Sequence, residues 1–234
     1  MYWIIGVIIL IYFLFKVYNH LPENTQLKIK KPSISSSGEQ FEKDIDSILT
    51  RVATQTGGKC FRDIMIEIND FSCQIDNILL TNKALYVIES KDYSGWIYGS
   101  FSQEYWMQTF AHYRNRYSGK TVSKFKFYNP IKQNQNHIKF LIDKFPQIKS
   151  IPIKNFVVFG KLATLKNIQK KTNDSYVITI RHLQSTLIEA EHQVSKEINQ
   201  YLHADIINGI LSANITDPTK RLEHVKRVQK KYHS

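Results

Sequence analysis

Residues Cys73–Lys91 read CQIDNILLTNKALYVIESK, and this stretch decides the fold. Two runs rich in Ile, Leu, Val and Tyr flank the polar segment Thr81–Lys83, as in two β-strands joined by a tight turn. Successive side chains of a strand point to opposite faces of a sheet, so Glu89 and Lys91 share one face while Ser90 points to the other. The sequence therefore predicts a β-hairpin whose second strand ends in charged residues.

A carboxylate also interrupts the first of these strands, at Asp76. Mg²⁺ prefers oxygen ligands and binds through one or two carboxylates while it keeps several waters. Asp76 and Glu89 are therefore candidate ligands of Mg²⁺ or Mn²⁺, and the carbonyl of Ser90 offers a third oxygen. A metal here would acidify a bound water and neutralise charge on a phosphate. The compact cation of Lys91 would orient or deprotonate that water, or hold the phosphate.

Ordinary polar residues at a turn and at a strand end give the same pattern, so the pattern alone leaves both interpretations open. Further motifs make it more specific. They occur in chain order, at Ser37–Glu42, Gln74–Asp76, Val87–Gly95 and Asn129–Gln133. Together they resemble the nuclease-related (NERD) domain of the PD-(D/E)xK nuclease superfamily, over roughly residues 35 to 160. The chain departs from the family at Ser35, where the family has a glycine, and this departure affects a turn rather than the chemistry.

The resemblance implies an α/β fold with a restriction-endonuclease-like mixed β-sheet flanked by helices. It implies metal-assisted hydrolysis of DNA phosphodiester bonds, with Mg²⁺ or Mn²⁺ as cofactor. The catalytic residues that it implies are Asp76, Glu89 and Lys91, with supporting roles for Glu39 and Gln133. A carboxylate in the first turn of a helix is also favoured by the helix dipole, which is the alternative for Glu39. A surface position is the alternative for Gln133.

Composition points to a basic domain with a polyanionic partner. The 234 residues suffice for one medium domain with attachments. The net charge is +12 and the isoelectric point is near 9.5, which favours a polyanionic partner, either nucleic acid or an anionic membrane surface. Cys60 and Cys73 form neither a disulfide framework nor a C-x-x-C motif, and we expect free thiols in neighbouring strands.

The chain begins with an apolar run, Tyr2–Phe15. This run is shorter than the roughly 20 residues of a membrane-spanning helix, but with Lys16 as a snorkelling residue it extends to Leu21. We expect an uncleaved single-pass anchor over residues 1–21. A buried core helix is one alternative. A signal peptide is the other, although the run lacks a preceding basic residue and a small-x-small cleavage site. Basic residues follow the run and none precedes it, so we expect a cell-membrane protein whose C-terminal domain is cytoplasmic.

The remaining chain is predicted to contain a polar linker over residues 22–37, a nuclease-like domain over 38–160, and a C-terminal part over 161–234 that completes or packs on this domain and ends in a basic tail. Helices are expected over residues 37–52, 129–145, 182–201 and 218–231. Strands are expected over 60–68, 153–159 and 176–180, in addition to the hairpin, with a second short hairpin over 96–108. Within the latter, Trp96 and Trp106 are interpreted as packing residues rather than base-stacking ones.

Residues 111–128 combine basic and aromatic side chains and contain no acidic residue. Basic groups bind phosphates and aromatic rings stack on bases, so the segment is a candidate nucleic-acid-binding element. A solvated loop with its aromatic rings packed on the domain is the alternative. The candidate phosphate-binding residues are Arg114, Arg116, Lys120, Lys124 and Lys126.

Three functions remain open at this point. The favoured one is a membrane-anchored, metal-dependent DNA nuclease. The second is a non-catalytic, membrane-tethered nucleic-acid-binding module with the same fold, and the presence of all the charged site residues argues against it. The third uses the positive charge for membrane docking alone. Salt-dependent DNA binding separates the third from the other two, and cleavage with and without Mg²⁺ separates the first from the second.

Overall fold

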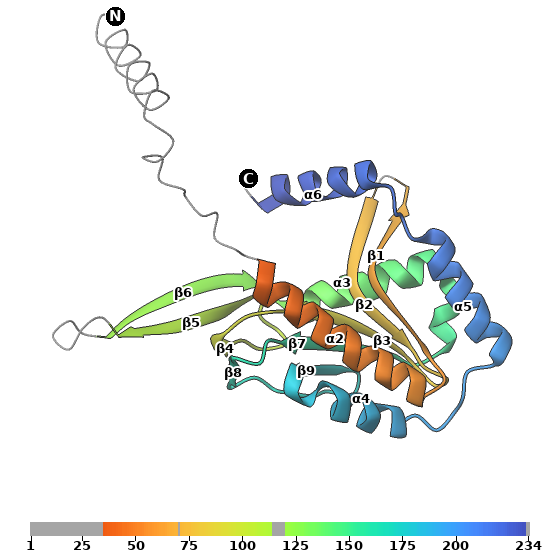
Figure 1. Cartoon of the computed structure of the whole chain (residues 1–234), viewed down its shortest axis with the longest axis horizontal. Helices are drawn as coiled ribbons and strands as arrows, with labels where there is room; N and C mark the ends of the chain where they lie inside the picture. Colours follow the sequence, from red (N-terminus) through yellow and green to blue (C-terminus); the bar gives the residue numbers. More distant parts are fainter. Residues whose placement is uncertain (1–34, 70, 114–119, 233–234) are drawn as a thin grey trace, which may run out of the picture. The chain divides into compact units, whose positions relative to one another are not determined.

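The computed structural model describes residues 35–69, 71–113 and 120–232, and side chains within 38–69, 71–110 and 122–227. The chain divides into two units, residues 1–36 and 37–234, and the second contains the sheets of Figure 1. The predicted anchor at residues 1–21 lies outside the described residues, as does most of the predicted linker. Within the described ranges no helix has the length and apolar character needed to cross a membrane.

The first sheet has five strands in the order β1-β2-β3-β7-β9 (Figure 1). Neighbours among β1 (Lys59–Ile68), β2 (Phe71–Leu80) and β3 (Leu85–Lys91) are antiparallel. β3, β7 (Ile153–Phe159) and β9 (Ser175–Thr179) are parallel. The sheet is therefore mixed, as expected, and the predicted central hairpin is confirmed as β2–β3.

Helices cover both faces of this sheet. α2 (Ser35–Gln55) and α4 (Leu183–His192) pack on one face, and α3 (Pro130–Lys144) and α5 (Gln200–Ala213) pack on the other. α2 presents Phe41, Ile45, Leu49 and Val52 at the three- and four-residue spacing of one helical face, and all four are buried. The prediction of an α/β fold with helices flanking a mixed sheet is confirmed.

The pairing of β1 with β2 is irregular beside Asp76. Asp63 has a left-handed φ of 51° and lies between Arg62 and Ile64, whose partners Asn77 and Ile75 flank Asp76. β2 pairs with β3 only over Asn77–Leu80, so the first half of β2 pairs with β1 alone. Asp76 therefore lies where β2 separates from β3, near the carboxyl end of β3.

The second sheet has four strands in the order β6-β5-β4-β8. Its strands are β4 (Gly95–Tyr98), β5 (Tyr105–Tyr113), β6 (Lys120–Tyr128) and β8 (Ala163–Lys166). One face packs on β7, β9 and the start of α3, through a core that includes Ile97, Trp106 and Phe159. Trp106 is 1% exposed, as its predicted packing role requires, whereas Trp96 remains 40% exposed.

Two expectations of local structure are corrected. The alternative of a solvated loop is wrong for Ala111–Tyr113 and Lys120–Tyr128, which pair as the ends of β5 and β6. The single helix expected over residues 182–201 is interrupted, because α4 ends at His192 and α5 begins at Gln200. The side chain of Asn199 starts α5 by accepting the N–H groups of the next turn.

The predicted basic helix is confirmed as α6 (Pro218–Tyr232), which lies against the β1–β2 hairpin. Arg221 forms an ion pair with Asp63, and Nδ1 of His224 lies 2.8 Å from Oγ of Ser72. α6 is therefore fixed to the domain at the hairpin that carries Asp76.

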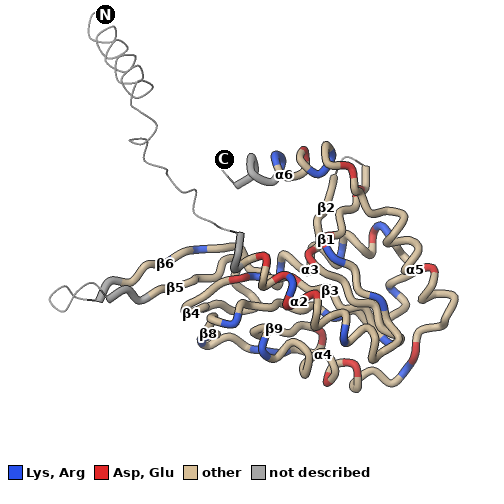
Figure 2. The backbone as a smooth tube through the Cα atoms, viewed as in Figure 1, with Lys and Arg blue, Asp and Glu red and all other residues tan. Residues whose placement is uncertain are grey.

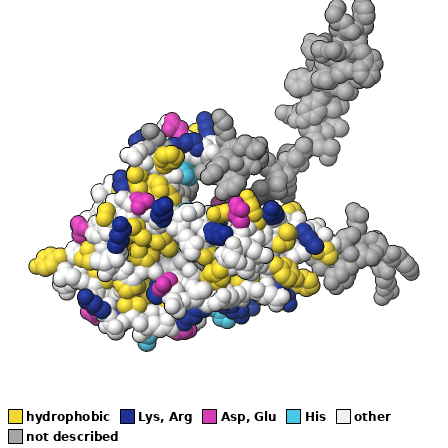
Figure 3. All heavy atoms as spheres, turned by 180° about the vertical axis from the view of Figure 1, so that it is seen from behind, with side chains coloured by type: hydrophobic (Ala, Val, Ile, Leu, Met, Phe, Trp, Pro, Cys, Tyr) yellow, Lys and Arg dark blue, Asp and Glu magenta, His cyan; other side chains and the backbone are white. Residues whose placement is uncertain are grey.

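On the face opposite to that of Figure 1, hydrophobic side chains remain exposed among Lys and Arg side chains (Figure 3).

Candidate active site

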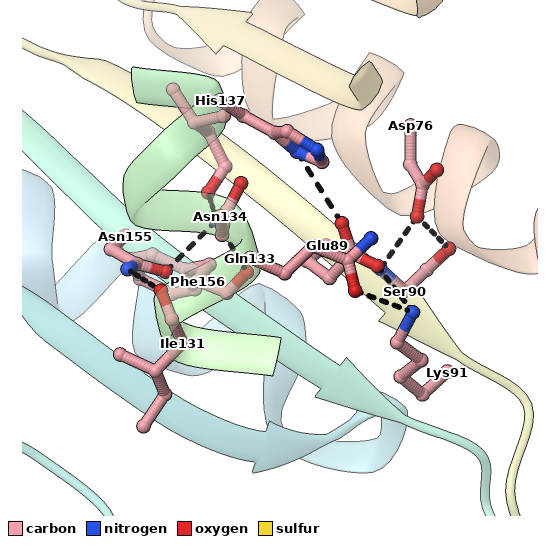
Figure 4. Close-up of polar contacts among 11 residues, drawn as sticks. Asp76, Glu89, Ser90, Lys91, Ile131, Gln133, Asn134, His137, Asn155 and Phe156 are labelled. Carbon is pink, nitrogen blue, oxygen red and sulfur yellow. Dashed lines mark hydrogen bonds and ion pairs between the residues drawn. The ribbon is translucent and has the colours of Figure 1, made fainter. Parts of the chain in front are cut away.

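Ser90 holds Asp76 against the end of β3. Oδ2 of Asp76 accepts the backbone N–H of Ser90 at 2.9 Å and its hydroxyl at 3.0 Å (Figure 4). Both hydrogen bonds reach the same oxygen, and Oδ1 accepts none from the part of the chain that the structure describes. The position of the Asp76 charge is thus set by the strand end that also carries Glu89 and Lys91.

Glu89 and Lys91 form an ion pair that reaches the first turns of α3. Nζ of Lys91 lies 2.5 Å from Oε1 of Glu89 and donates to Oε1 of Gln133 at 3.2 Å (Figure 4). The side chain of Glu89 is 1% exposed and that of Lys91 is 19% exposed. Gln133 is placed here because Asn129 caps α3 and Pro130 begins it. Lys91 is therefore fixed from two sides and is the more accessible member of the pair.

His137 follows Gln133 by one helical turn and faces Glu89. Its Nδ1 lies 3.5 Å from Oε2 of Glu89. Both atoms are buried, and neither has a hydrogen-bond partner among the described residues. Buried polar atoms without partners are uncommon and costly. Of the atoms in this cluster, these two would therefore gain the most from a bound cation or a further hydrogen bond.

The pKa values in this cluster are displaced in opposite directions. Burial, and then the charge of Asp76, raise the pKa of Glu89 to about 7, although Lys91 opposes this. Burial, the largest single influence, would lower the pKa of Lys91, but the charge and hydrogen bond of Glu89 and the charge of Asp76 together outweigh it, so the pKa is raised. Burial lowers the pKa of His137 to about 4. At neutral pH, Lys91 is thus charged and His137 is neutral, while Glu89 is protonated more readily than an ordinary glutamate.

Asn134 fixes α3 to the sheet between Gln133 and His137. Its side-chain NH₂ donates to the carbonyl of Val87 at 2.7 Å, to Oδ1 of Asn155 at 2.9 Å and to the carbonyl of Phe156 at 3.3 Å. The side chain of Asn155 in turn donates to the carbonyl of Ile131 at 3.0 Å (Figure 4). This buried network sets the height of α3 over β3 and β7, so it positions Gln133 and His137 against Glu89.

Asp76 also borders a cavity of about 430 Å³ on the side of α2. Glu39 from α2 lines the same cavity, together with Gln74 and Ser90. Within the described residues, no three His, Cys, Asp or Glu side chains are grouped closely enough to hold a metal by themselves. Any metal here would consequently depend on two carboxylates with backbone, water or substrate oxygens.

The structure brings together most of the predicted site residues. Asp76 contacts Ser90, and Lys91 contacts Glu89 and Gln133, so the end of β3 carries both groups of contacts. Glu39 lines the cavity that Asp76 and Ser90 border. The predicted phosphate-binding residues are elsewhere: Lys124 and Lys126 lie exposed on β6 of the second sheet, and Lys120 begins that strand. Arg114 and Arg116 lie outside the described residues.

Two polar residues of the site, Asn134 and His137, were not predicted from the sequence. His137 follows Gln133 by four positions, which places both on one face of a helix, and this spacing is the signal that could have found it. Asn134 has no such signal, because its partners come from β3 and β7 and depend on the register of the sheet.

A mixed sheet with carboxylates and a lysine at the end of a strand is the arrangement that the resemblance to nuclease-related domains implies. Residues 37–160 match the model of the nuclease-related domain. The chain is also 31% identical, over 159 residues, to an uncharacterized protein of Bacillus anthracis, and the alignment covers 68% of each chain. The chain therefore belongs to the nuclease-related domain family, and this membership indicates a nuclease-like function.

Proposed function

We propose that the protein is a membrane-anchored, metal-dependent nuclease that hydrolyses phosphodiester bonds of DNA. One observation carries the proposal: the carboxylate of Glu89 is buried, one of its oxygens accepts no hydrogen bond from the described residues, and it lies beside the ammonium of Lys91 and within the field of Asp76. The sheet order and the position of this cluster at the end of β3 support a restriction-endonuclease-like core.

The donor set fits Mg²⁺ or Mn²⁺. Two carboxylates and a backbone carbonyl are oxygen ligands, and Mg²⁺ commonly takes no more than one or two carboxylates from the protein. Burial and the charge of Asp76 raise the pKa of Glu89, and a bound cation would offset both effects. We assign Asp76, Glu89 and the carbonyl of Ser90 to the ion, which when bound would acidify a water and offset charge on the phosphate.

The remaining side chains would orient the reacting groups. Lys91, held by Gln133 and Glu89, would place its ammonium against a phosphate oxygen or the attacking water. Ser90 keeps Asp76 from rotating away from the end of β3. Glu39, across the cavity, is proposed as a supporting carboxylate.

DNA is the proposed substrate because the chain carries a net charge of +12. The direct test incubates the full chain, in detergent, with plasmid and linear DNA in Mg²⁺, Mn²⁺ or EDTA. Cleavage with either metal and none in EDTA is expected. DNA binding without cleavage under all conditions would instead support the non-catalytic binding module, and the absence of binding at low salt would support membrane docking.

The membrane anchor is proposed from the apolar run Tyr2–Phe15. An inserted apolar helix is not held by charge, so detergent should release the full chain from membranes while high salt and alkaline carbonate should not. Quantitative release by carbonate would contradict the anchor and would leave the nuclease proposal untouched.

A further inference from the structure

The second sheet has a face that the protein core does not cover. Side chains alternate along its strands, and Ile97, Trp106 and Phe127 point to the core. The register pairs Tyr98 with both Met107 and Lys166, and Met107 with Lys126. These residues and their neighbours two positions away form the opposite face. We call it the outer face and define it by Trp96, Tyr98, Tyr105, Lys124, Lys126 and Lys166.

Aromatic rings and ammonium groups lie side by side on the outer face. Trp96 is 40% exposed and Tyr105 is 44% exposed. Nζ of Lys126 lies 4.1 Å from the ring centroid of Tyr105, and Nζ of Lys166 lies 5.5 Å from that of Trp96. Each of these exposed rings is thus paired with a cation at the distance of a cation–π contact.

The outer face is hollowed as well as charged. A cavity of about 380 Å³ is lined by Tyr98, Tyr105, Lys126 and Lys166, with Gly99 among its other residues. A Cβ at Gly99 would lie 2.3 Å from the indole of Trp106, so glycine is required for the backbone to approach that ring.

Negative charge is missing from these strands. The sequences of β4, β5, β6 and β8 contain no Asp or Glu, whereas lysines occur on β6 and β8 (Figure 2). The outer face thus combines accessible rings, a hollow and lysines on strands without acidic residues, which together are complementary to exposed nucleobases and phosphates.

We propose that the outer face binds an unpaired strand of the nucleic-acid substrate. Bases stack on Trp96, Tyr98 and Tyr105, and the lysines contact the phosphates. Stacking on a protein ring requires a base that is free of its own stack, which favours a single strand over a duplex. A flat lipid surface would not enter the hollow between the rings. This inference rests on the proposed function for its substrate and adds the class of substrate, DNA with an unpaired segment.

The outer face is close enough to the candidate active site to guide a strand into it. Three residues separate Lys91 at the end of β3 from Gly95 at the start of β4, so the two are four residue steps apart. At about 3.5 Å per extended residue, these ends are within about 14 Å of each other. A strand bound on Trp96 would therefore reach Lys91 within a few nucleotides.

The test measures binding by the full chain in detergent and EDTA, with a labelled single-stranded oligothymidylate and a blunt duplex of equal length. Trp96→Leu and Tyr105→Leu should each weaken binding of the single strand about fivefold or more, with little change for the duplex. Phe125→Leu is the matched control. Phe125 is 54% exposed on β6, but it alternates with Lys124 and Lys126 and contacts Phe110, which places it on the other face.

Parental affinity in both outer-face variants, or an equal loss in Phe125→Leu, would overturn the inference. It would also be overturned if the outer-face variants lost binding to phosphatidylserine vesicles while they kept the oligothymidylate. Because EDTA removes divalent metal, binding is measured independently of cleavage. Single-strand binding by a chain that never cleaves DNA would refute the proposed catalysis and leave the outer face standing.

Discussion

The two sheets of this protein differ in how much of each is covered and in which charges they carry. Helices bury both faces of the first sheet, and near the end of β3 Glu89 pairs with Lys91 while the charge of Asp76 acts on Glu89. The second sheet is covered on one face, and its strands carry lysines without a carboxylate. We therefore propose that the first sheet carries the site of phosphodiester hydrolysis and that the second sheet binds the nucleic-acid strand.

The largest expected effect separates the two faces of the second sheet. Trp106→Ala should lower the free energy of unfolding by about 3–5 kcal/mol, because it empties a fully buried indole position. Trp96→Ala should cost about 1 kcal/mol or less, because its ring already contacts solvent. Chemical denaturation of both variants, followed by circular dichroism, measures the difference. Equal losses would mean that the outer face is part of the core rather than a surface.

The second prediction concerns the first sheet. Asp76→Asn and Glu89→Gln keep the side-chain shape but remove the charge that a hard cation needs, so each should lose Mn²⁺ binding and reduce cleavage about 100-fold or more. Lys91→Ala should reduce cleavage to a similar degree while Mn²⁺ binding survives or tightens, because a neighbouring cation is gone. Calorimetric titration of Mn²⁺ into the parent and the three variants, with cleavage assays in parallel, tests both statements.

A carboxylate that does not face the cluster provides the control. Asp205→Asn changes an exposed residue of α5 that hydrogen-bonds Gln147, and it should retain parental metal binding and cleavage. Equal Mn²⁺ binding by the parent, Asp76→Asn and Lys91→Ala would remove Asp76 from the proposed metal site.

The two sheets were not equally predictable. Long apolar runs such as Leu85–Ile88 identify the buried strands of the first sheet, because a strand covered on both faces has few polar positions to confuse the pattern. In the second sheet the alternation of Lys124–Phe127 is the signal of a strand, but the same residues also suit a basic, aromatic loop. β8 and the pairing of β5 with β6 were not predicted, because the partner of each strand depends on contacts that no local pattern specifies.

The candidate site was predictable to the extent that its residues lie on one hairpin. Asp76, Glu89 and Lys91 come from adjacent strands, so turn and alternation place them near one another. His137 and Asn134 come from α3, and their contacts require the crossover that makes β7 the neighbour of β3. The pKa of Glu89 could not be anticipated either, because it depends on burial by that helix.

The third prediction uses the opposed pKa values of Glu89 and His137. The ordinary pKa of Glu is 4.5 and that of Glu89 is about 7, so its stabilisation is present below pH 4.5 and lost as the pH rises through 7. The ordinary pKa of His is 6.5 and that of His137 is about 4, so its stabilisation is present above pH 6.5 and lost as the pH falls to 4. The contributions of Glu89 and His137 to the slope of unfolding free energy against pH have opposite signs and should largely cancel in the parent protein.

Removing one of the two groups should reveal the pH dependence that the other contributes, a change in unfolding free energy on the order of 2 kcal/mol across its titration range. His137→Asn should become less stable as the pH rises from 4.5 to 7, and Glu89→Gln should become less stable as it falls from 6.5 to 4. Urea unfolding in EDTA at several pH values measures both. Curves with the same sign of slope in the two variants would show that these groups do not titrate as their burial implies.

The smallest expected effect concerns the lysines of β6. Each lysine that contacts a phosphate of a single strand contributes about 0.7 to the slope of log K against log salt. Lys124→Gln and Lys126→Gln should therefore each flatten that slope by up to about 0.7, while affinity falls similarly for all sequences. Lys149→Gln and Lys196→Gln remove the same charge at exposed positions outside the second sheet, so they separate local contact from net charge. A slope that falls equally in all four variants would indicate a general charge effect. A slope that falls only in the β6 variants would show that the acid-free sheet meets the phosphates, and an unaltered slope in every variant would exclude β6 from the nucleic-acid interface.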